Sequence, residues 1–408
     1  MIRSRTSAGY SLAVLTFINL FNYLDRWVVA AVVESIKRSE LHPTDTQLGL
    51  LGTGFLIVYT FTSPIFGSLG DRRSRPPLIA LGVALWSIAT ALAGFARSFA
   101  SLFTARSTVG VGEAAYGTIA PALLADSFPL EKRGLVFATF FAAIPIGSAA
   151  GYVLGGLVDK HFGWRAAFWI AGTPGLILSL LVLFVYDPPR GVEDSIASLS
   201  EQPRAAVFHA YRDLIRNSPY ILTVLGYGAY TFALGGLAFW MPAFLERSRG
   251  MTRSEATVTF GAIALITGFV GTFAGGWLGD FFLRWTKQSY LWVSGIATLA
   301  AAPVTYVALT DHRHGVYLTA IVIAELLIFM STGLVNCAVV NAVAPGERAT
   351  ALGLSVFVMH LLGDIPSPPL IGKISDATSL EHAFLIVPVA IVIGGAIWTF
   401  AAWRGRST

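Results

Sequence analysis

Long apolar stretches alternate with short polar breaks along the chain, and this alternation predicts a membrane protein built of helices. Twelve apolar stretches can be counted. Each reaches the roughly 20 residues that a helix needs to cross a hydrocarbon core about 30 Å thick. They are too long and unbroken for barrel strands, which need only about 10 alternating residues. The predicted spans are 11–33, 47–70, 77–96, 99–125, 134–158, 165–186, 220–245, 255–281, 289–310, 315–343, 349–375 and 383–403.

The polar breaks divide these spans into two halves. The longest break, 187–219, separates six spans from six and opens with Asp187 and two prolines, which end a helix. Within it, 204–216 places apolar residues on one face and basic residues elsewhere, which predicts an amphipathic helix at the membrane surface. We therefore expect an N-terminal six-helix bundle (1–186), a cytoplasmic linker and a C-terminal six-helix bundle (220–408), in an all-α membrane protein.

Composition and charge support this interpretation. Hydrophobic residues make up 55% of the chain and charged residues only 12%, against roughly 25% charged in soluble proteins. Lys and Arg are more frequent in the segments that lie inside if the N-terminus is inside, which predicts that both termini are cytoplasmic. A run of Arg247, Arg249 and Arg253 in a predicted outer loop is the main exception. The net charge of +5 suits loops that face anionic lipid, and no nucleic-acid module is recognised.

Cys337 is the only cysteine, which excludes an intrachain disulfide and a thiolate metal site. Because it lies in an apolar span, we expect a small buried residue. Neither a cofactor nor a metal site is expected.

One short phrase occurs twice. Gly-Ser-Leu-Gly-Asp ends at Asp71 and Gly-Trp-Leu-Gly-Asp ends at Asp280, about half of the 408 residues later, and each ends a long apolar stretch. A chain that repeats itself at half its length inside a membrane is typical of a duplicated transporter. The copies differ afterwards, because Arg72 and Arg73 are replaced by two phenylalanines in the second.

The run Gly67-Ser68-Leu69-Gly70-Asp71-Arg72-Arg73-Ser74-Arg75 resembles the signature of the major facilitator superfamily. The resemblance implies two six-helix bundles enclosing a central cavity that opens alternately to each side. It also implies a cytoplasmic latch, in which Asp71, Arg72 and Arg75 act with Arg133 to control the equilibrium between states. A tight turn with positive-inside charges is the simpler alternative.

Three further segments resemble the Spinster branch of that superfamily. They are Phe21-Asn22-Tyr23-Leu24-Asp25-Arg26, the stretch 106–114, and His360-Leu361-Leu362-Gly363-Asp364-Ile365-Pro366-Ser367-Pro368. The resemblance implies export of lysolipids or sphingoid phosphates. The chain lacks the long terminal extensions of animal members and is similar to a bacterial one, which implies a multi-pass protein of the cell inner membrane.

Four charged residues lie deep inside predicted spans, where each costs several kcal/mol unless paired or hydrated. At 1.5 Å per residue, Asp25 and Glu113 come to similar depths, roughly 20 Å from the inner face, and Arg26 falls between Glu113 and Arg106. Asp25 and Arg26 point about 100° apart, so neither is the main partner of the other. One of them is expected to face the cavity and the other a neighbouring helix.

We predict that Glu113 binds the coupling proton, with Asp25 as a second candidate carboxylate. Arg26 and Arg106 are predicted to hold an anionic headgroup, because the guanidinium fork binds phosphate bidentately. The alternative is a static buried ion pair that fixes two helices and has no role in transport.

Span 11 carries a second candidate for proton coupling. His360 and Asp364 are four residues apart on one helical face and are predicted to form a hydrogen-bonded pair. The helix that carries them is broken by Pro366, Pro368 and Pro369, and histidine can titrate near neutral pH. An ordinary packing histidine is the alternative.

Candidate substrate contacts come from spans 5 and 10. Tyr152 lies among Gly147, Gly151 and Gly155, whose four-residue spacing predicts a close helix-packing face. Its hydroxyl either reaches the cavity, or Tyr152 is an ordinary packing tyrosine. Spans 7 and 10 are aromatic, and Phe329, Thr332 and Asn336 are predicted to line the cavity. The superfamily resemblance thus implies a cavity that is charged on one side and aromatic on the other, which suits an amphipathic substrate. Core or lipid-facing packing is the alternative for the aromatic residues.

Together these features predict a secondary-active transporter that moves a lysophospholipid or sphingoid phosphate by alternating access, with the proton as candidate coupling ion. A monomer is expected. A transporter of small organic anions or drugs on the same fold is the first alternative. An intramembrane enzyme would need a metal cluster, a catalytic dyad or a nucleotide loop, and none is recognised. An ATP-driven pump would need a Gly-x-x-x-x-Gly-Lys-Ser/Thr loop, which the sequence lacks.

Overall fold

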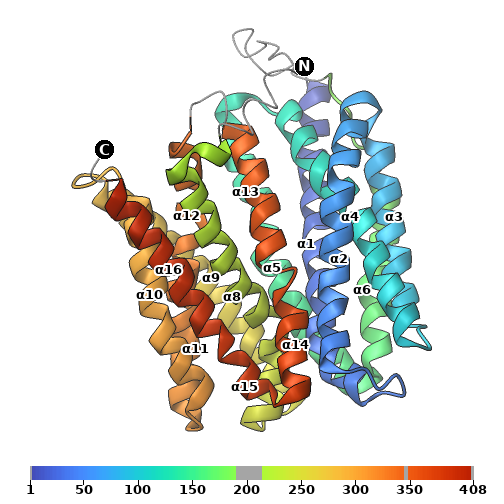
Figure 1. Cartoon of the computed structure of the whole chain (residues 1–408). Helices are drawn as coiled ribbons and strands as arrows, with labels where there is room; N and C mark the ends of the chain where they lie inside the picture. The colour runs from blue at the N-terminus through green and yellow to red at the C-terminus, as the bar shows by residue number, and fades with distance from the viewer. Residues whose placement is uncertain (1, 190–213, 344–347, 406–408) are drawn as a thin grey trace. The chain divides into compact units, whose positions relative to one another are not determined.

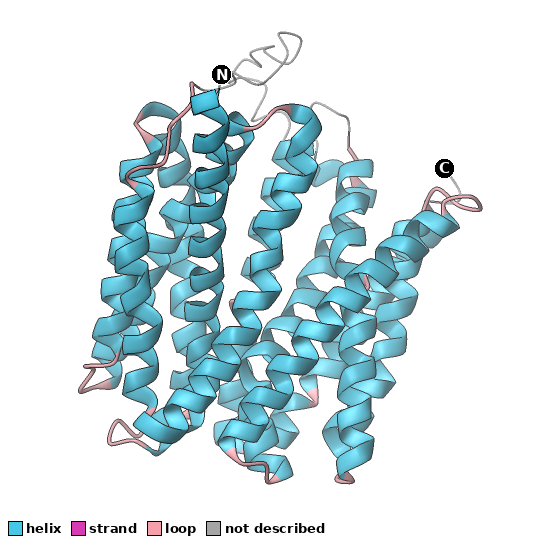
Figure 2. Cartoon of the chain, turned by 180° about the vertical axis from the view of Figure 1, so that it is seen from behind, coloured by secondary structure: helices cyan, strands magenta, loops and turns pink. Residues whose placement is uncertain are grey.

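The computed structural model describes residues 2–189, 214–343 and 348–405, without the side chains of 2–7, 71, 130–134, 138 and 348–350. Every regular element in these ranges is a helix (Figure 2). This confirms the predicted all-α fold.

Eleven helical segments in the described ranges are long and apolar enough to cross a membrane. The remaining predicted span corresponds to α4 (Phe99–Ser127), which has 29 residues and is also long enough. It is not among those eleven, and it carries the charged residues Arg106, Glu113 and Asp126. With α4 included, the helices account for the twelve predicted spans.

The chain forms two compact units, and the first consists of 1–43, 50–201 and 252–261. Within it α1 packs along α5 and α6, and α3 packs along α4 and α6 (Figure 1). Its core contains Trp86, Tyr116 and Phe140, with the Trp86 and Tyr116 rings edge to face at 5.7 Å. Besides α4, the helices are α1 (Ile2–Arg38), α2 (Asp45–Arg72), α3 (Arg75–Ala93), α5 (Leu130–Phe162) and α6 (Trp164–Val182).

The predicted small-residue face of α5 packs directly on α1. A Cβ atom at Gly147 would lie 2.4 Å from the carbonyl oxygen of Leu20, and one at Gly151 would lie 2.5 Å from that of Leu24. Only glycine therefore permits this approach of the two backbones. The contact fixes the rotation of α1 at the level of its charged residues.

The second unit consists of 44–49, 202–251 and 262–408, so that α2 and α9 each run from one unit into the other. In it α8 packs against α13 and α16, and α10 packs against α11 and α16 (Figure 1). The helices are α8 (Ser218–Arg249), α9 (Arg253–Phe282), α10 (Ser289–Thr310), α11 (His314–Phe329), α12 (Ser331–Asn341), α13 (Arg348–Leu362), α14 (Ser367–Ala377), α15 (Leu380–Phe384) and α16 (Ile386–Arg404).

Three predicted spans of the second half are interrupted helices. Span 349–375 is divided between α13 and α14 by a turn at 363–366, as its prolines predict. Span 315–343 is divided at Met330, whose carbonyl oxygen lies only 2.0 Å from where a Cβ atom of Gly275 would stand. Span 383–403 is divided at Leu385.

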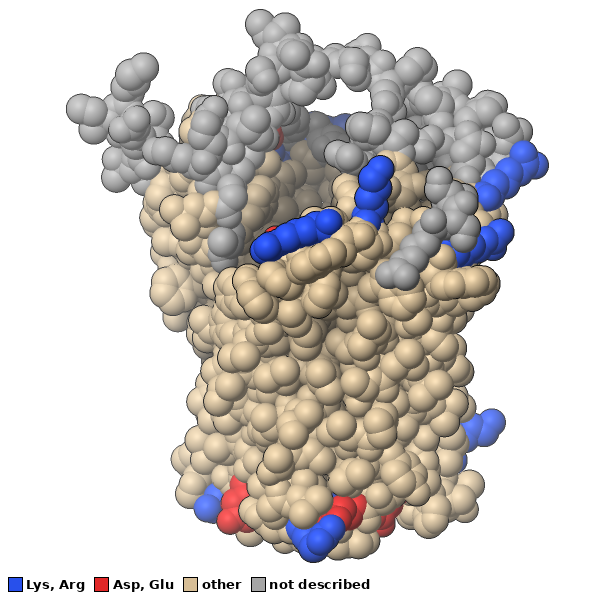
Figure 3. Space-filling view, turned by 90° about the vertical axis from the view of Figure 1, so that its left-hand side faces the viewer, with Lys and Arg blue, Asp and Glu red and all other residues tan. Residues whose placement is uncertain are grey.

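On the face seen in Figure 3, Lys, Arg, Asp and Glu gather towards the two ends and leave a broad band of other residues between them. A band of this kind is what a bilayer-spanning protein presents to lipid hydrocarbon.

Two expectations from the sequence turn out differently. Cys337 is exposed, so the expected burial is wrong, because the buried face of α12 is formed by Leu334, Val335 and Ala338 instead. The predicted linker helix 204–216 lies, except for its last three residues, outside the described residues.

The three arginines of the predicted outer loop, which run against the charge bias, each have an acidic partner. Arg247 donates to both carboxylate oxygens of Asp45, at 2.6 and 2.9 Å, within the second unit. Arg249 pairs with Glu381 at 3.0 Å in that unit, and Arg253 pairs with Asp159 at 2.9 Å in the first. These cations therefore serve packing and do not contribute free positive charge to the loop.

Removal of the Arg247 side chain is expected to destabilise the second unit. Asp45 is 2% exposed and accepts a further hydrogen bond from Ser375 Oγ at 2.6 Å, so Arg247→Gln leaves a buried carboxylate without its cation. The expected cost is about 3 kcal/mol, read as a lower Tm of the detergent-solubilised protein. Arg313→Gln is the matched control, because the Arg313 side chain is 79% exposed and its pair with Asp311 should contribute little. Equal Tm values for the two variants would contradict this prediction.

Candidate functional site

The four deep charges of the first unit form two crossed ion pairs. Arg26 Nη2 on α1 donates to Glu113 Oε2 on α4 at 2.7 Å. Arg106 Nη1 on α4 donates to Asp25 Oδ1 on α1 at 3.0 Å. Neighbouring residues on α1 thus bind residues two helical turns apart on α4, and neither is the main partner of the other. We call these four residues the crossed-pair cluster.

The Asp25–Arg106 pair is enclosed. Both side chains are 1% exposed, and Thr90 Oγ1 from α3 donates to Asp25 Oδ2 at 2.5 Å. The Arg106 guanidinium also lies 5.8 Å from the ring centre of Phe168 on α6. This pair therefore ties four helices together, and Arg106 has no open path to a ligand in this conformation of the unit.

The Arg26–Glu113 pair is partly open. The Arg26 side chain is 20% exposed, whereas that of Glu113 is fully buried. The guanidinium carbon lies 4.8, 4.9 and 5.5 Å from the ring centres of Tyr23, Phe55 and Tyr59. These rings stabilise the cation from the side while part of it stays accessible.

Two polar atoms of this pair are left over. Glu113 Oε1 and Arg26 Nε are buried and have no hydrogen-bond partner among the described residues. A buried polar atom without a partner costs roughly 1–3 kcal/mol, so these two atoms make the pair a candidate binding site. A proton on the free oxygen would remove the buried charge of Glu113, and an anionic oxygen could accept from the free N–H of Arg26.

Tyr152 lies inside the first unit. Its ring is 2% exposed and contacts Trp27 at 5.5 Å and Phe260 at 5.1 Å between ring centres. The described contacts are those of a packing aromatic beside the glycine face of α5.

The expected latch residue Arg75 has partners that the sequence analysis missed. Its guanidinium binds Asp126 and Asp187, each at 2.6 Å, and the carbonyl oxygen of Pro188 at 2.7 Å. The sequence signal for these pairs is that Asp126 and Asp187 follow predicted spans 4 and 6. Both spans are predicted to end on the inner side, where Arg75 also lies. Arg72 is exposed, and the side chains of Asp71 and Arg133 lie outside the described residues.

The second unit carries its own polar group. His360 Nδ1 lies 2.8 Å from Asp364 Oδ1 and 3.0 Å from Oδ2, where α13 ends. The Tyr230 hydroxyl donates to the carbonyl oxygen of Ile328 at 3.0 Å and lies 3.1 Å from Thr332 Oγ1.

The other predicted substrate contacts lie on α11 and α12 of this unit. Asn336 Nδ2 donates to the carbonyl oxygen of Thr332 at 3.0 Å. The half-buried Phe329 lies against Gly271 of α9. Glu325 is 4% exposed and accepts a 3.3 Å hydrogen bond from Thr267. Among the described residues, no cluster of His, Cys, Asp and Glu is suited to hold a metal ion.

Comparison with known proteins gives consistent matches over most of the chain. The family model of the Major Facilitator Superfamily matches residues 15–368. Protein spinster homolog 1 of Xenopus tropicalis is 34% identical over 95% of this chain and 79% of its own length. Protein spinster homolog 1 of Homo sapiens is 37% identical over 89% of this chain and 72% of its own length.

A solved structure agrees in fold. A bacterial homolog of the human lysosomal transporter Spinster, in an inward-facing and unoccupied conformation, superimposes with a TM-score of 0.89. The match covers 98% of both chains at 24% sequence identity, and at that identity it shows the fold alone.

Proposed function

We propose a transport function for this chain, which belongs to the major facilitator superfamily and, within it, to the Spinster proteins. The proposed substrate is an amphipathic anionic lipid, a lysophospholipid or a sphingoid phosphate, moved by alternating access and coupled to protons. The observation that carries the proposal is the partly exposed Arg26, held beside a carboxylate with one unsatisfied oxygen.

Arg26 is the proposed contact for the anionic headgroup. Of the two cations in the crossed-pair cluster it is the accessible one, at 20% exposure against 1% for Arg106. A guanidinium binds a phosphate through parallel N–H donors, and Arg26 Nε, although buried in this conformation, has no hydrogen-bond partner among the described residues. Arg106, paired with Asp25, is proposed to position α1 against α4.

Glu113 is the proposed proton carrier. With Glu113 ionised, Arg26 is neutralised by it and binds a second anion weakly. A proton on Glu113 removes the carboxylate charge and leaves Arg26 free for the headgroup. Substrate and proton thereby favour each other's binding, which is the sign of coupling that a symporter requires.

The second unit is proposed to bind the apolar part of the substrate. Phe329, Thr332 and Asn336 are the candidate contacts, and His360 with Asp364 is a second candidate for proton transfer. Asp71, Arg72, Arg75 and Arg133 are proposed to control the equilibrium between states. We also propose a monomer in the cell inner membrane with both termini cytoplasmic, supported by the Lys and Arg bias of the loops.

Reconstituted binding and transport test the substrate. Arg26→Gln is expected to lower lysolipid affinity by about 10–100-fold, since charge-assisted hydrogen bonds contribute about 1.5–3 kcal/mol, while Arg26→Lys retains part of it. Arg165→Gln is the matched control, because Arg165 also lies over an aromatic ring of the first unit, 4.2 Å from Trp164, outside the cluster.

The alternative substrate class gives a different result in the same assay. A transporter of small organic anions or drugs depends on Arg26 as well, but short anions compete with its substrate as strongly as lysolipids do. Competition by lysolipids and not by short anions supports the lipid proposal, and equal competition overturns it.

A further inference from the structure

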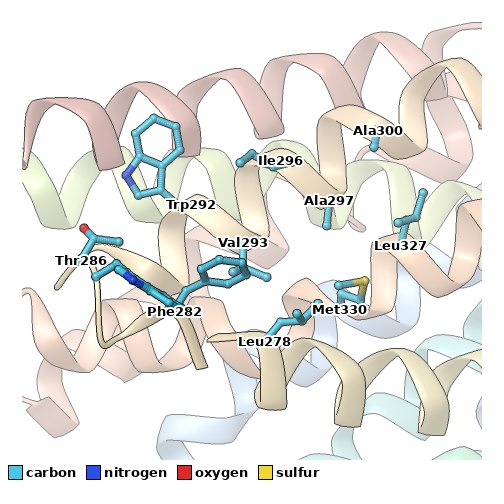
Figure 4. A pocket seen from close by; sticks show the side chains of 11 residues that line it. Leu278, Phe282, Thr286, Trp292, Val293, Ile296, Ala297, Ala300, Leu327 and Met330 are labelled. Carbon is cyan, nitrogen blue, oxygen red and sulfur yellow. The ribbon is translucent and has the colours of Figure 1, made fainter. Parts of the chain in front are cut away.

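An apolar groove of about 670 Å³ lies in the second unit, between α9, α10 and α11. Figure 4 shows its lining, with Phe282, Thr286 and Trp292 towards one end and Ala300 and Leu327 towards the other. Val293, Ala297 and Met330 form its buried floor. Its volume is within the range of about 300–1,000 Å³ in which proteins bind small molecules. We call it the α9–α10 groove.

The groove is open to the outside of its unit along its length. Ile296 is 56% exposed and Trp285, at one end, is 64% exposed. Because the surrounding phase at this depth is lipid, the natural occupant of such an opening is hydrocarbon and not water.

One end of the groove carries tryptophan and positive charge. Trp285 and Trp292 line it, and tryptophan prefers the boundary between hydrocarbon and headgroups. Arg284 and Lys287 flank Trp285 in sequence and are exposed, and the Arg284 guanidinium lies 4.3 Å from the ring centre of Phe281. The segment 280–290 holds one acidic residue, Asp280, against the two basic ones, so its net charge is positive. The Asp280 carboxylate accepts a hydrogen bond from the Tyr290 hydroxyl at 3.0 Å.

We propose that the α9–α10 groove binds an anionic phospholipid of the surrounding bilayer, with one acyl chain along the groove and the phosphate on Arg284 and Lys287. The bound lipid is distinct from the transported substrate, since no residue of the groove lining belongs to the crossed-pair cluster or to the candidate substrate contacts Phe329, Thr332 and Asn336. The occupancy of this site between α9, α10 and α11 therefore depends on the lipid composition of the membrane.

A second groove in the same unit shows what distinguishes this one. It has about 500 Å³, lies between α10 and α11, and is equally apolar, with Val304, Val307 and Ile323 in its lining. The arginine next to it in sequence, Arg313, is bonded to Asp311 through Nε and Nη2. It offers apolar volume beside an arginine that is already paired, and is a matched control.

Tryptophan quenching tests the proposal. The purified full chain is titrated in detergent with brominated phosphatidylglycerol or brominated phosphatidylcholine, whose bromine atoms quench tryptophan fluorescence. The part of the quenching that disappears in the double variant Trp285→Phe/Trp292→Phe is assigned to the groove. Two independent variants follow, Arg284→Gln/Lys287→Gln for the headgroup and Ala300→Phe to fill the groove. Lys373→Gln and Val304→Phe are the controls for lost charge and added bulk.

The wild type and both controls are expected to bind phosphatidylglycerol more tightly than phosphatidylcholine. Each lost cation should weaken phosphatidylglycerol binding about fivefold, so the double variant loses about 25-fold and its preference for the anionic lipid. Ala300→Phe should reduce the quenching by both lipids. Unchanged phosphatidylglycerol binding in either variant, or no preference in the wild type, overturns the proposal and leaves the proposed transport function untouched.

Discussion

Replacing Glu113 with glutamine is expected to abolish proton-driven transport while the protein still folds. Glutamine keeps the shape of the side chain and a carbonyl oxygen that accepts from Arg26, but it cannot exchange a proton. Transport by the variant should therefore no longer respond to a pH gradient, measured as lysolipid flux in proteoliposomes at several internal and external pH values. Because Arg26 loses its counter-ion, affinity for an anionic lipid should rise and become independent of pH.

Glu34→Gln is the matched control for this variant. Glu34 is also a buried glutamate, 4% exposed on α1, but it pairs with Arg38 at 3.4 Å and not with the crossed-pair cluster. Its replacement should leave the pH response intact. An unchanged pH response in Glu113→Gln would refute the assignment of Glu113 as proton carrier.

Breaking the Asp25–Arg106 pair is expected to have the largest effect on stability. Asp25→Asn or Arg106→Leu alone leaves one charge buried without its partner, because both side chains are 1% exposed. We expect a loss of about 3–5 kcal/mol for either single variant, measured as a lower Tm or unfolding midpoint.

The double variant Asp25→Asn/Arg106→Leu separates stability from function. With both charges removed, most of the lost stability should return, since a neutral replacement of a buried pair is often tolerated. Transport should stay impaired, because α1 and α4 lose the contact that positions Arg26 and Glu113. If the loss of stability in the double variant equalled the sum of the losses in the two single variants, the two charges would not be coupled as the structure indicates.

The spans could be predicted from the sequence because they depend on composition over about 20 residues. The pairing of the deep charges could be predicted only in part. Adjacent residues on a helix point in different directions, which excluded an Asp25–Arg26 pair, but depth alone could not assign Glu113 to one and Arg106 to the other. That choice depends on the rotation of α1, which its contact with Gly147 and Gly151 of α5 fixes.

Features that depend on two distant segments could not be predicted. The interruption at Met330 arises where Gly275 of α9 approaches its carbonyl oxygen, and nothing in the apolar run 315–343 marks that point. Arg75 was assigned to the latch by its place in the signature, whereas its observed partners, Asp126 and Asp187, come from two other span ends. The α9–α10 groove is likewise lined by residues from several helices. Within the sequence of each helix, these residues do not differ from the other apolar residues of a membrane span.

The charges of the crossed-pair cluster sum to zero, since two arginines face two carboxylates. One added proton makes the cluster singly positive, and a singly charged headgroup restores neutrality. The empty and the loaded carrier then carry the same charge across the bilayer. Membrane voltage, which acts with about 2.3 kcal/mol per elementary charge per 100 mV, drives neither step for such a substrate. A doubly charged headgroup leaves one uncompensated negative charge, so its transport generates a current, and an electrical recording reveals the charge of the lipid that is carried.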